Sequence, residues 1–317
     1  MKVIFSSDAN EVYLKFWNVV RKQFLHMGYE SKLFLIGDEK PDYLEGEVEL
    51  VKPIPGVSTV VQALWAKFYF TKTEPDTKWF VGDIDQIPLN KSFFDKLANL
   101  DDTYYYCPVP ISVQDKSDPN FNISELSKDI PENATSVPGY YHVALGKTFI
   151  EILDLDKSFE DQVQEIIDGG YGIKSTNNKW NTLATNDWKY FCSEEQFSGE
   201  KICKRYDKVR TWGYIKSGYS GSLILPNDIT PEEHKKLSSE LPMRICRSTN
   251  CFFNPFLKDY YIDFHCPRPY DDYKDLIDKI VDFFNKNHKK LTVSSFDFCP
   301  IDPQIALTHL LKNYLEL

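Results

Sequence analysis

The sequence predicts a mixed α/β fold in which helices flank a mostly parallel central sheet, within a single large domain. The chain has 317 residues, of which 42% are hydrophobic, and this is enough to bury a sizeable core. Apolar runs at residues 2–5 and 32–36 are typical of strands, and the amphipathic segment 12–28 between them is typical of a helix. This order opens nucleotide-binding sheets, whose ligands lie at the carboxyl ends of the strands.

Strand and helix patterns continue to alternate after this opening. A helical pattern over 60–70 precedes an expected strand at 78–85, and a second helix over 92–100 precedes a strand at 103–111. The polar stretch 115–139 is a long loop, which in a compact domain is functional or disordered. The remaining expected elements are a strand at 140–146, a helix at 147–155, a loop at 168–187, a strand at 260–267, and helices at 271–290 and 303–317.

Charge and cysteine content exclude several classes of function. A net charge of -10 argues against nucleic acid as the main partner, because phosphate contacts need a basic surface. No Gly-x-Gly-x-x-Gly follows the first strand, so a dinucleotide cofactor is not indicated. Seven cysteines without Cys-x-x-Cys spacing indicate reduced thiols, and no signal peptide or transmembrane segment is found. We therefore expect a cytoplasmic protein.

The segment 76–97 contains the strongest chemical signal. Its apolar run ends at Gly82 and is followed by Asp83 and Asp85. If the strand continues through them, both carboxylates face one side while Ile84 packs on the other. Two such carboxylates suit Mg²⁺ or Mn²⁺, whose other ligands come from substrate phosphates and water, and Gly82 lets a ligand approach the backbone.

Two other interpretations concern aspartate pairs of this kind. Asp83 and Asp85 could instead cap the next helix or bind backbone amides in a turn. A second Asp-x-Asp, at Asp154 and Asp156, follows a helical pattern, which predicts a solvated helix end rather than a ligand site.

The order of these motifs resembles a known family. The nucleotide-type first strand, the helix VVQALWAKFYF and the run WFVGDIDQIPLNKSFF are similar to the nucleotide-sugar-dependent glycosyltransferases of the Rossmann-like GT-A fold. The resemblance covers most of the chain in element order but only short motifs in residues. It implies that Asp83 and Asp85 hold a divalent cation, Mn²⁺ or Mg²⁺, on the diphosphate of the donor.

Further residues take their expected roles from this resemblance. The segment 261–269 is similar to the late histidine turn of glycogenin-like members, which implies that His265 completes the metal shell and Arg268 replaces a phosphate-binding lysine. The usual glycine of that turn is missing from this segment. Lys67, with Gln62 in reserve, would face the donor. The other expected donor-binding residues are Phe5, Ser6, Ser7, Asp8, Gly82 and Ile84.

The segment 186–197 resembles the tryptophan and acidic pair that lie beside the acceptor in this family. It implies that Glu195 accepts a hydrogen bond from the acceptor hydroxyl or acts as its general base, with Glu194 and Asp187 as alternatives. The two glutamates are adjacent, so on a helix they splay by about 100° and we expect one of them to reach the site. The expected acceptor-binding residues, each of which could instead be a core residue, are Tyr140, Tyr141, His142, Trp180 and Trp188.

Together these features predict a metal-dependent enzyme that moves a sugar from a nucleoside diphosphate sugar, expected to be a UDP-sugar, to a hydroxyl of a glycan or glycoconjugate. The single domain 1–317 would comprise a nucleotide-sugar-binding half at 1–112, an acceptor-binding half at 113–269 and C-terminal helices at 270–317. The histidine turn favours retention of configuration, which needs no general base and so competes with the role given to Glu195. The alternatives are a haloacid-dehalogenase-type phosphatase and a non-catalytic sugar-binding protein.

Overall fold

The computed structural model divides the chain into two compact units that alternate along the sequence. The first unit comprises Met1–Asn10, Phe24–Ile84 and Leu97–Gly221, and the second comprises Glu11–Gln23, Asp85–Lys96 and Ser222–Leu317. The residues that the structure describes are 1–107, 111–112, 137–172, 190, 192–205, 208–211, 214–215, 243–247, 251 and 261–286. The predicted boundaries at 112 and 269 stay a prediction.

A seven-stranded mixed sheet forms the centre of the first unit. Its strand order is β3-β2-β1-β4-β8-β6-β9. The first four strands in this order are mutually parallel, while β8 is antiparallel to β4 and β6. The prediction of a mostly parallel α/β sheet is therefore confirmed. The strand bounds are β1 Lys2–Asp8, β2 Ser31–Ile36, β3 Glu47–Val51, β4 Lys78–Val81, β6 Tyr105–Cys107, β8 His142–Leu145 and β9 Val209–Thr211.

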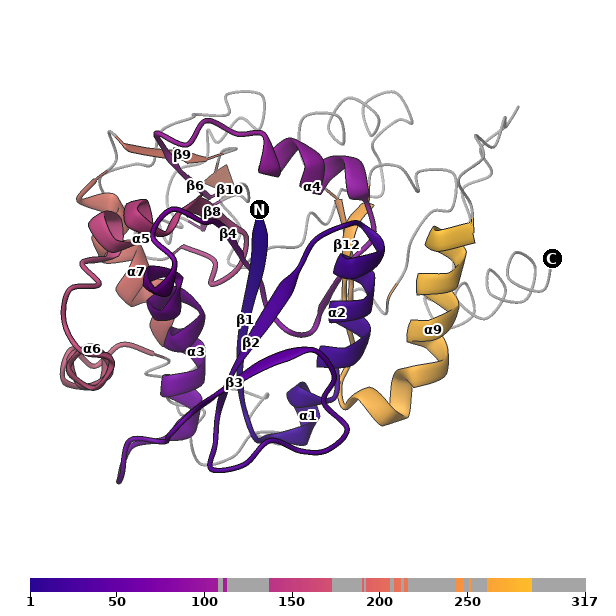
Figure 1. Cartoon of the computed structure of the whole chain (residues 1–317), viewed down its shortest axis with the longest axis horizontal. Coiled ribbons are helices and arrows are strands. Elements are labelled where there is room, and N and C mark those ends of the chain that lie inside the picture. Colours follow the sequence, from indigo (N-terminus) through magenta and orange to yellow (C-terminus); the bar gives the residue numbers. More distant parts are fainter. Residues whose placement is uncertain are drawn as a thin grey trace. The chain divides into compact units, whose positions relative to one another are not determined.

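Helices cover both faces of β1, as alternate side chains of this strand show. Ser6 donates a hydrogen bond to the carbonyl of Ala63 in α3 (Thr59–Tyr69), while the ring centroid of Phe5 lies 5.7 Å from that of Phe24 in α2 (Trp17–His26). Neighbouring residues of a strand point to opposite faces, so α3 and the end of α2 lie on opposite sides of the sheet. Figure 1 shows α3 running beside β1, β2 and β3.

Three more helices of the first unit pack near α3 (Figure 1). They are α5 (Gly146–Leu153), α6 (Phe159–Asp168) and α7 (Ser193–Cys203), and a 3₁₀ turn, η1 (Phe70–Thr73), follows α3. The indole of Trp65 in α3 meets the ring of Phe197 in α7 edge to face, with centroids 4.9 Å apart. This buried aromatic contact joins the helix that precedes β4 to the helix that carries the predicted acidic pair. A short parallel pair, β7 (Ile111–Ser112) and β10 (Tyr214–Ile215), also belongs to this unit.

The second unit contains a three-stranded sheet in the order β11-β12-β5. β12 (Tyr261–His265) is parallel to β11 (Met243–Cys246) and antiparallel to β5 (Gln86–Pro88). The amphipathic helix α9 (Tyr270–Lys286) buries an apolar face, and its Phe284 ring lies 6.2 Å from that of Tyr261 in β12. The short helix α1 (Glu11–Leu14) also lies here, as does α4 (Lys91–Ala98) as far as Lys96.

Several elements differ from the sequence-based expectations. The strand predicted over 78–85 ends at Val81, and Ile84 and Asp85 lie in a turn before β5. The idea that one extended strand points both carboxylates to the same side is therefore wrong. The helix predicted over 12–28 is divided into α1 and α2. The elements that were not predicted are the strands β3, β5, β9, β10 and β11, the helices α6 and α7, and the 3₁₀ turn η1. The expected helix at 303–317 lies outside the described residues.

Of the helices in the described ranges, none is long and apolar enough to span a membrane.

Candidate functional site

The last residue of β1, Asp8, places a carboxylate at the carboxyl end of the parallel strands. Asp8 accepts hydrogen bonds at its two oxygens from the Thr59 hydroxyl (2.9 Å) and from the Asn10 amide (3.2 Å). β1 lies between β2 and β4, and the chain after it leads to β2 on one side while β4 pairs on the other. The ends of β1 and β4 therefore form the point where strand order reverses, at which ligands of α/β sheets bind.

Residues predicted to contact the donor along β1 have clear structural partners. Ser6 links β1 to α3, because its oxygen also accepts the Lys67 amide at 3.1 Å. Ser7 donates to the carbonyl of Asp8 at 2.9 Å. Phe5 is fully buried, and a Cβ atom added to Gly82 would lie only 2.8 Å from its ring. Gly82 thus lets an aromatic ring of the core lie against the backbone, and a direct donor contact of these residues stays a prediction.

A buried lysine meets Asp83 directly after β4. Lys67 of α3 donates a hydrogen bond to Asp83 Oδ1, and its Nζ lies 3.9 Å from Oε1 of Glu194 in α7. The Lys67 side chain is only 3% exposed. Lys67, Asp83, Glu194 and the adjacent Glu195 are called the Lys67 cluster below. The cluster brings together a predicted donor residue, a predicted metal ligand and the predicted acidic pair.

The charges in the Lys67 cluster shift one another's pKa. Burial opposes the charge of Lys67, but the attraction of Asp83 and then Glu194 more than offsets it and raises the pKa of the ammonium. Burial raises the pKa of Glu194 to about 8, which the nearby Lys67 reduces only in part. Burial also raises the pKa of Glu195, although the Gly139 amide stabilises its carboxylate. One ammonium therefore faces three carboxyl groups, and at least one of them holds a proton near neutral pH.

Both members of the acidic pair lie beside Gly139, and which of them reaches an acceptor stays a prediction. The Gly139 amide donates to Glu195 Oε1 at 3.2 Å, and a Cβ atom added to Gly139 would lie 2.5 Å from Glu194 Oε1. Glu194 Oε2 is buried without a hydrogen-bond partner among the described residues. The segment 137–142 is thus shaped around the N-terminal turn of α7. Asp187, Trp180 and Trp188 lie outside the described residues.

The predicted acceptor residues after Gly139 are buried. His142 Nε2 donates to the Pro138 carbonyl at 2.5 Å, so its Nδ1 accepts the Tyr105 hydroxyl at 2.8 Å. Burial lowers the pKa of His142 to about 3, so the imidazole is neutral. Tyr141 is also buried, with its amide bonded to the Val81 carbonyl at 2.7 Å, and Tyr140 is 5% exposed. Their contact with an acceptor stays a prediction.

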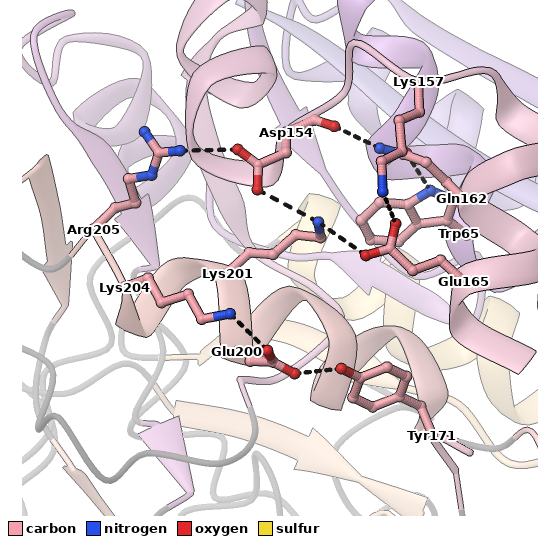
Figure 2. Close-up of polar contacts among 10 residues, drawn as sticks. All are labelled: Trp65, Asp154, Lys157, Gln162, Glu165, Tyr171, Glu200, Lys201, Lys204 and Arg205. Carbon is pink, nitrogen blue, oxygen red and sulfur yellow. Dashed lines mark hydrogen bonds and ion pairs between the residues drawn. The ribbon is translucent and has the colours of Figure 1, made fainter. Parts of the chain in front are cut away.

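A polar network fixes α7 against α5 and α6 (Figure 2). The fully buried Gln162 accepts the Trp65 indole N–H at 2.9 Å and donates to the Asp154 carbonyl at 2.6 Å. The Asp154 carboxylate in turn accepts Arg205 at 2.9 Å and pairs with Lys201 of α7 at 3.5 Å. Asp154 ends α5 in a left-handed conformation (φ 53°). The second Asp-x-Asp therefore begins with an ion-paired helix end, which has a structural role.

Asp85 lies in the second unit, where its surroundings are cationic. Its Oδ2 accepts Arg247 Nη1 at 2.6 Å and lies 3.6 Å from His265 Nε2 and 3.7 Å from Arg268 Nε. Strand pairing assembles this group: the carbonyl of Asp85 accepts the Cys266 amide at 2.9 Å, and Cys246, one residue before Arg247, pairs with His265 in register. We call Asp85, Arg247, His265 and Arg268 the Asp85 cluster.

Two neighbours hold Asp85 as a carboxylate. Its burial alone would raise the pKa, but His265 and Arg247 more than offset this and lower the pKa well below its usual range. Burial lowers the pKa of Arg268 to about 10, so the guanidinium remains charged at neutral pH, above the ring of Tyr13 at 4.4 Å. The nearby cations therefore stabilise the negative charge of the buried Asp85.

The donor atoms of Asp85 and His265 fit a divalent cation. Two ligands about 2.1 Å from one ion and about 90–120° apart are separated by about 3.0–3.6 Å, which matches the 3.6 Å between Asp85 Oδ2 and His265 Nε2. A carboxylate oxygen with an imidazole nitrogen is also a suitable donor set for Mn²⁺. Within the described ranges, no group of three or more His, Cys, Asp and Glu side chains converges as a metal cage.

Sequence reasoning missed three residues of these clusters. Arg247 directly follows the short strand β11, which pairs with the strand that contains His265. A charged residue at the end of a strand is the signal that could have found it. Gly139 and Gln162 gave no such signal, because their roles depend on residues distant in sequence. Gly139 contacts Glu195, 56 residues away, and Gln162 contacts Trp65, 97 residues away.

No protein-family model matches the chain, and no curated protein matches its sequence significantly. Among solved structures, the galactosyltransferase LgtC in complex with donor and acceptor sugar analogs has 11% identity and a TM-score of 0.42, over 93% of this chain and 98% of that one. The glycosyltransferase GlyE of Streptococcus pneumoniae TIGR4 has 12% identity and a TM-score of 0.39, over 99% of this chain and 64% of GlyE. Likeness at these TM-scores establishes neither a shared fold nor a shared function.

Proposed function

We propose that the chain is a metal-dependent glycosyltransferase of the GT-A type, which moves a sugar from a nucleoside diphosphate sugar, a UDP-sugar, to a hydroxyl of a glycan or glycoconjugate. The observation that carries the proposal is the placement of Asp8 at the carboxyl end of β1 and of Asp83 two residues after β4, two neighbouring parallel strands. Their carboxyl ends meet at one edge of the sheet, where nucleotide ligands of such sheets bind.

The residues proposed to hold the cation, Mn²⁺ or Mg²⁺, are the sequence-predicted ligands Asp83, Asp85 and His265. When bound, a dication supplies Lewis-acid stabilisation of the charge that develops on the leaving diphosphate. Arg268 binds phosphate oxygens through its guanidinium, which is charged and 20% exposed. Lys67 holds Asp83 in one orientation, since its Nζ donates to that carboxylate from within the core.

Glu194 and Glu195 provide the acid–base groups of the proposed reaction. A carboxyl group with a pKa near the working pH exchanges protons most effectively, and the pKa of Glu194, about 8, satisfies this condition. Glu195 is oriented by the Gly139 amide, which donates a hydrogen bond to its Oε1. With inversion, one of the two accepts the proton of the acceptor hydroxyl, while with retention the pair instead stabilises positive charge on the sugar.

Nucleotide-sugar turnover tests the proposal directly. The purified chain is incubated with Mn²⁺ and a panel of nucleoside diphosphate sugars, and released nucleoside diphosphate is measured with and without EDTA. We expect metal-dependent release from a UDP-sugar, since donor hydrolysis needs no known acceptor. Turnover of an aryl phosphate without any sugar-nucleotide turnover would instead support the phosphatase alternative, and metal-dependent donor binding without turnover would support a non-catalytic sugar-binding protein.

A further inference from the structure

Two guanidinium groups approach a single carboxylate in the Asp85 cluster. Arg247 Nη1 donates to Asp85 Oδ2 at 2.6 Å and to the Cys266 carbonyl at 3.2 Å, while Arg268 Nε lies 3.7 Å from the same carboxylate oxygen. Arg268 is also held by the ring of Tyr13. Both arginines are therefore oriented before any ligand binds, and both lie in the same unit of the chain.

The charges of this cluster do not cancel. Two guanidinium charges meet one carboxylate, so the described members of the cluster carry a net positive charge even when His265 is neutral. Asp263 of β12 is also buried, and Arg244 donates two hydrogen bonds to its carboxylate, of 2.8 and 2.5 Å. The cluster thus holds one guanidinium more than its carboxylate neutralises. This favours an anionic ligand, because uncompensated charge in a partly buried site costs free energy.

Arg247 and Arg268 are also more exposed to solvent than Arg244. The side chain of Arg244 is 5% exposed, whereas those of Arg247 and Arg268 are 24% and 20% exposed. Among the described residues, Arg247 uses only Nη1, which leaves Nη2 and Nε on the same planar fork. A guanidinium fork matches two oxygens of a phosphate group better than an ammonium does.

We propose that Arg247 is a phosphate-binding residue, which together with Arg268 grips a diphosphate group beside Asp85. This inference deepens the proposed function, on which the identity of the diphosphate as part of a sugar nucleotide rests. It has a consequence of its own: part of the affinity for a diphosphate comes from arginine and does not require a divalent cation. The interaction weakens with salt, because it joins charges that are in contact with solvent.

Binding of inorganic pyrophosphate in EDTA, measured by isothermal titration calorimetry, tests the inference without any sugar nucleotide. We expect the wild-type chain to bind, and R247Q to weaken binding by about tenfold or more, since two charge-assisted hydrogen bonds are lost. R247K should retain part of the affinity. R205Q is the matched control, because Arg205 is an ion-paired, 39% exposed arginine of the first unit, and its affinity should stay at the wild-type level.

Urea unfolding of each variant separates binding from stability. If R247Q is unfolded, R247K serves in its place, and a loss of affinity of about threefold or more at an unchanged unfolding midpoint supports the inference. Wild-type affinity in the Arg247 variant, or no pyrophosphate binding by the wild-type chain in EDTA, would overturn it. Because the probe carries no sugar, pyrophosphate binding without donor turnover would contradict the proposed function alone.

Discussion

The two aspartates of the Asp-x-Asp motif lie in opposite electrostatic surroundings. Asp83 belongs to a cluster in which one ammonium, that of Lys67, faces three carboxyl groups. Asp85 belongs to a cluster in which one carboxylate faces two guanidinium groups and an imidazole. The first cluster therefore has an excess of carboxyl groups, and the second has an excess of guanidinium groups. A motif that is symmetric in sequence thus places one aspartate among acidic neighbours and the other among basic neighbours.

The largest effect is expected from removal of the cation in the Lys67 cluster. Lys67→Met should lower the free energy of unfolding by roughly 3 kcal/mol, because it removes a charge-assisted hydrogen bond to Asp83 and the cation beside the buried Glu194. Lys204→Met, at an exposed pair with Glu200, is the matched control and should change it by less than about 0.5 kcal/mol. Urea unfolding measures both. Equal effects of the two substitutions would contradict the buried role of Lys67.

The pH dependence of stability tests the protonation of Glu194. Folding raises its pKa from 4.5 to about 8, so the folded state binds more protons in this interval. The stabilisation is therefore complete below pH 4.5 and is lost as pH rises through 8. As the pH rises from about 5 to about 8, the free energy of unfolding should fall by roughly 2–3 kcal/mol less in Glu194→Gln than in the wild type.

Two comparisons make this pH experiment specific. Glu160→Gln, at an exposed position of α6, should follow the wild-type curve. His142 acts in the opposite direction, since its folded pKa of about 3 lies below the usual 6.5; its contribution is present above pH 6.5 and is lost as pH falls toward 3, in every variant. Parallel curves for wild type and Glu194→Gln would show that Glu194 is not protonated in the folded state.

A smaller effect is expected from the network that positions α7. Gln162→Leu leaves the Trp65 N–H and the Asp154 carbonyl without their buried partner, and should lower the free energy of unfolding by about 2 kcal/mol. Gln164→Leu on the exposed face of the same helix loses only a bond to Asp168 and should be nearly neutral. Thermal or urea unfolding distinguishes them, and an equally small loss for both would show that the network does not hold α7.

The smallest effect on stability is expected at Gly139. A Cβ atom there would displace the flexible end of Glu194, so Gly139→Ala should lower the free energy of unfolding by only about 1 kcal/mol while disturbing the Lys67 cluster. Gly37→Ala, whose added atom would have no neighbour closer than 3.8 Å, is the control. Pyrophosphate binding should be unchanged in Gly139→Ala, since its ligands belong to the other cluster. Reduced pyrophosphate binding in Gly139→Ala would contradict the assignment of this binding to the Asp85 cluster alone.

Hydrophobic patterns predicted the sheet better than the site. The runs around Phe5, Leu33 and Trp79 became buried parallel strands, because burial on both faces gives a local apolar signal. The strand β3, at the edge of the sheet, alternates glutamate with valine and leucine. It was not predicted because its glutamates interrupt the apolar run that marks a buried strand. The strand predicted to contain both aspartates was too long, since Gly82 and the turn at Ile84 and Asp85 interrupt it.

The site could be predicted only where residue type and position both gave a signal. Asp83 and Asp85 were selected because carboxylates directly follow an apolar run, and His265 because the segment 261–269 resembles the histidine turn of a known family. The structure gives each of the three a charged neighbour. Their binding roles stay predictions. The proton on Glu194 and the anion preference of Arg247 depend on burial and on residues distant in sequence, which no local pattern encodes.

Donor binding by two aspartate variants tests the central claim most directly. Affinity for a UDP-sugar in Mn²⁺ is measured by calorimetry for the wild type, Asp85→Ala and Asp156→Ala, the last at an exposed position of the second Asp-x-Asp. We expect Asp156→Ala to bind like the wild type, and Asp85→Ala to remain folded and lose metal-dependent binding. Unchanged donor affinity in a folded Asp85→Ala variant would contradict the account.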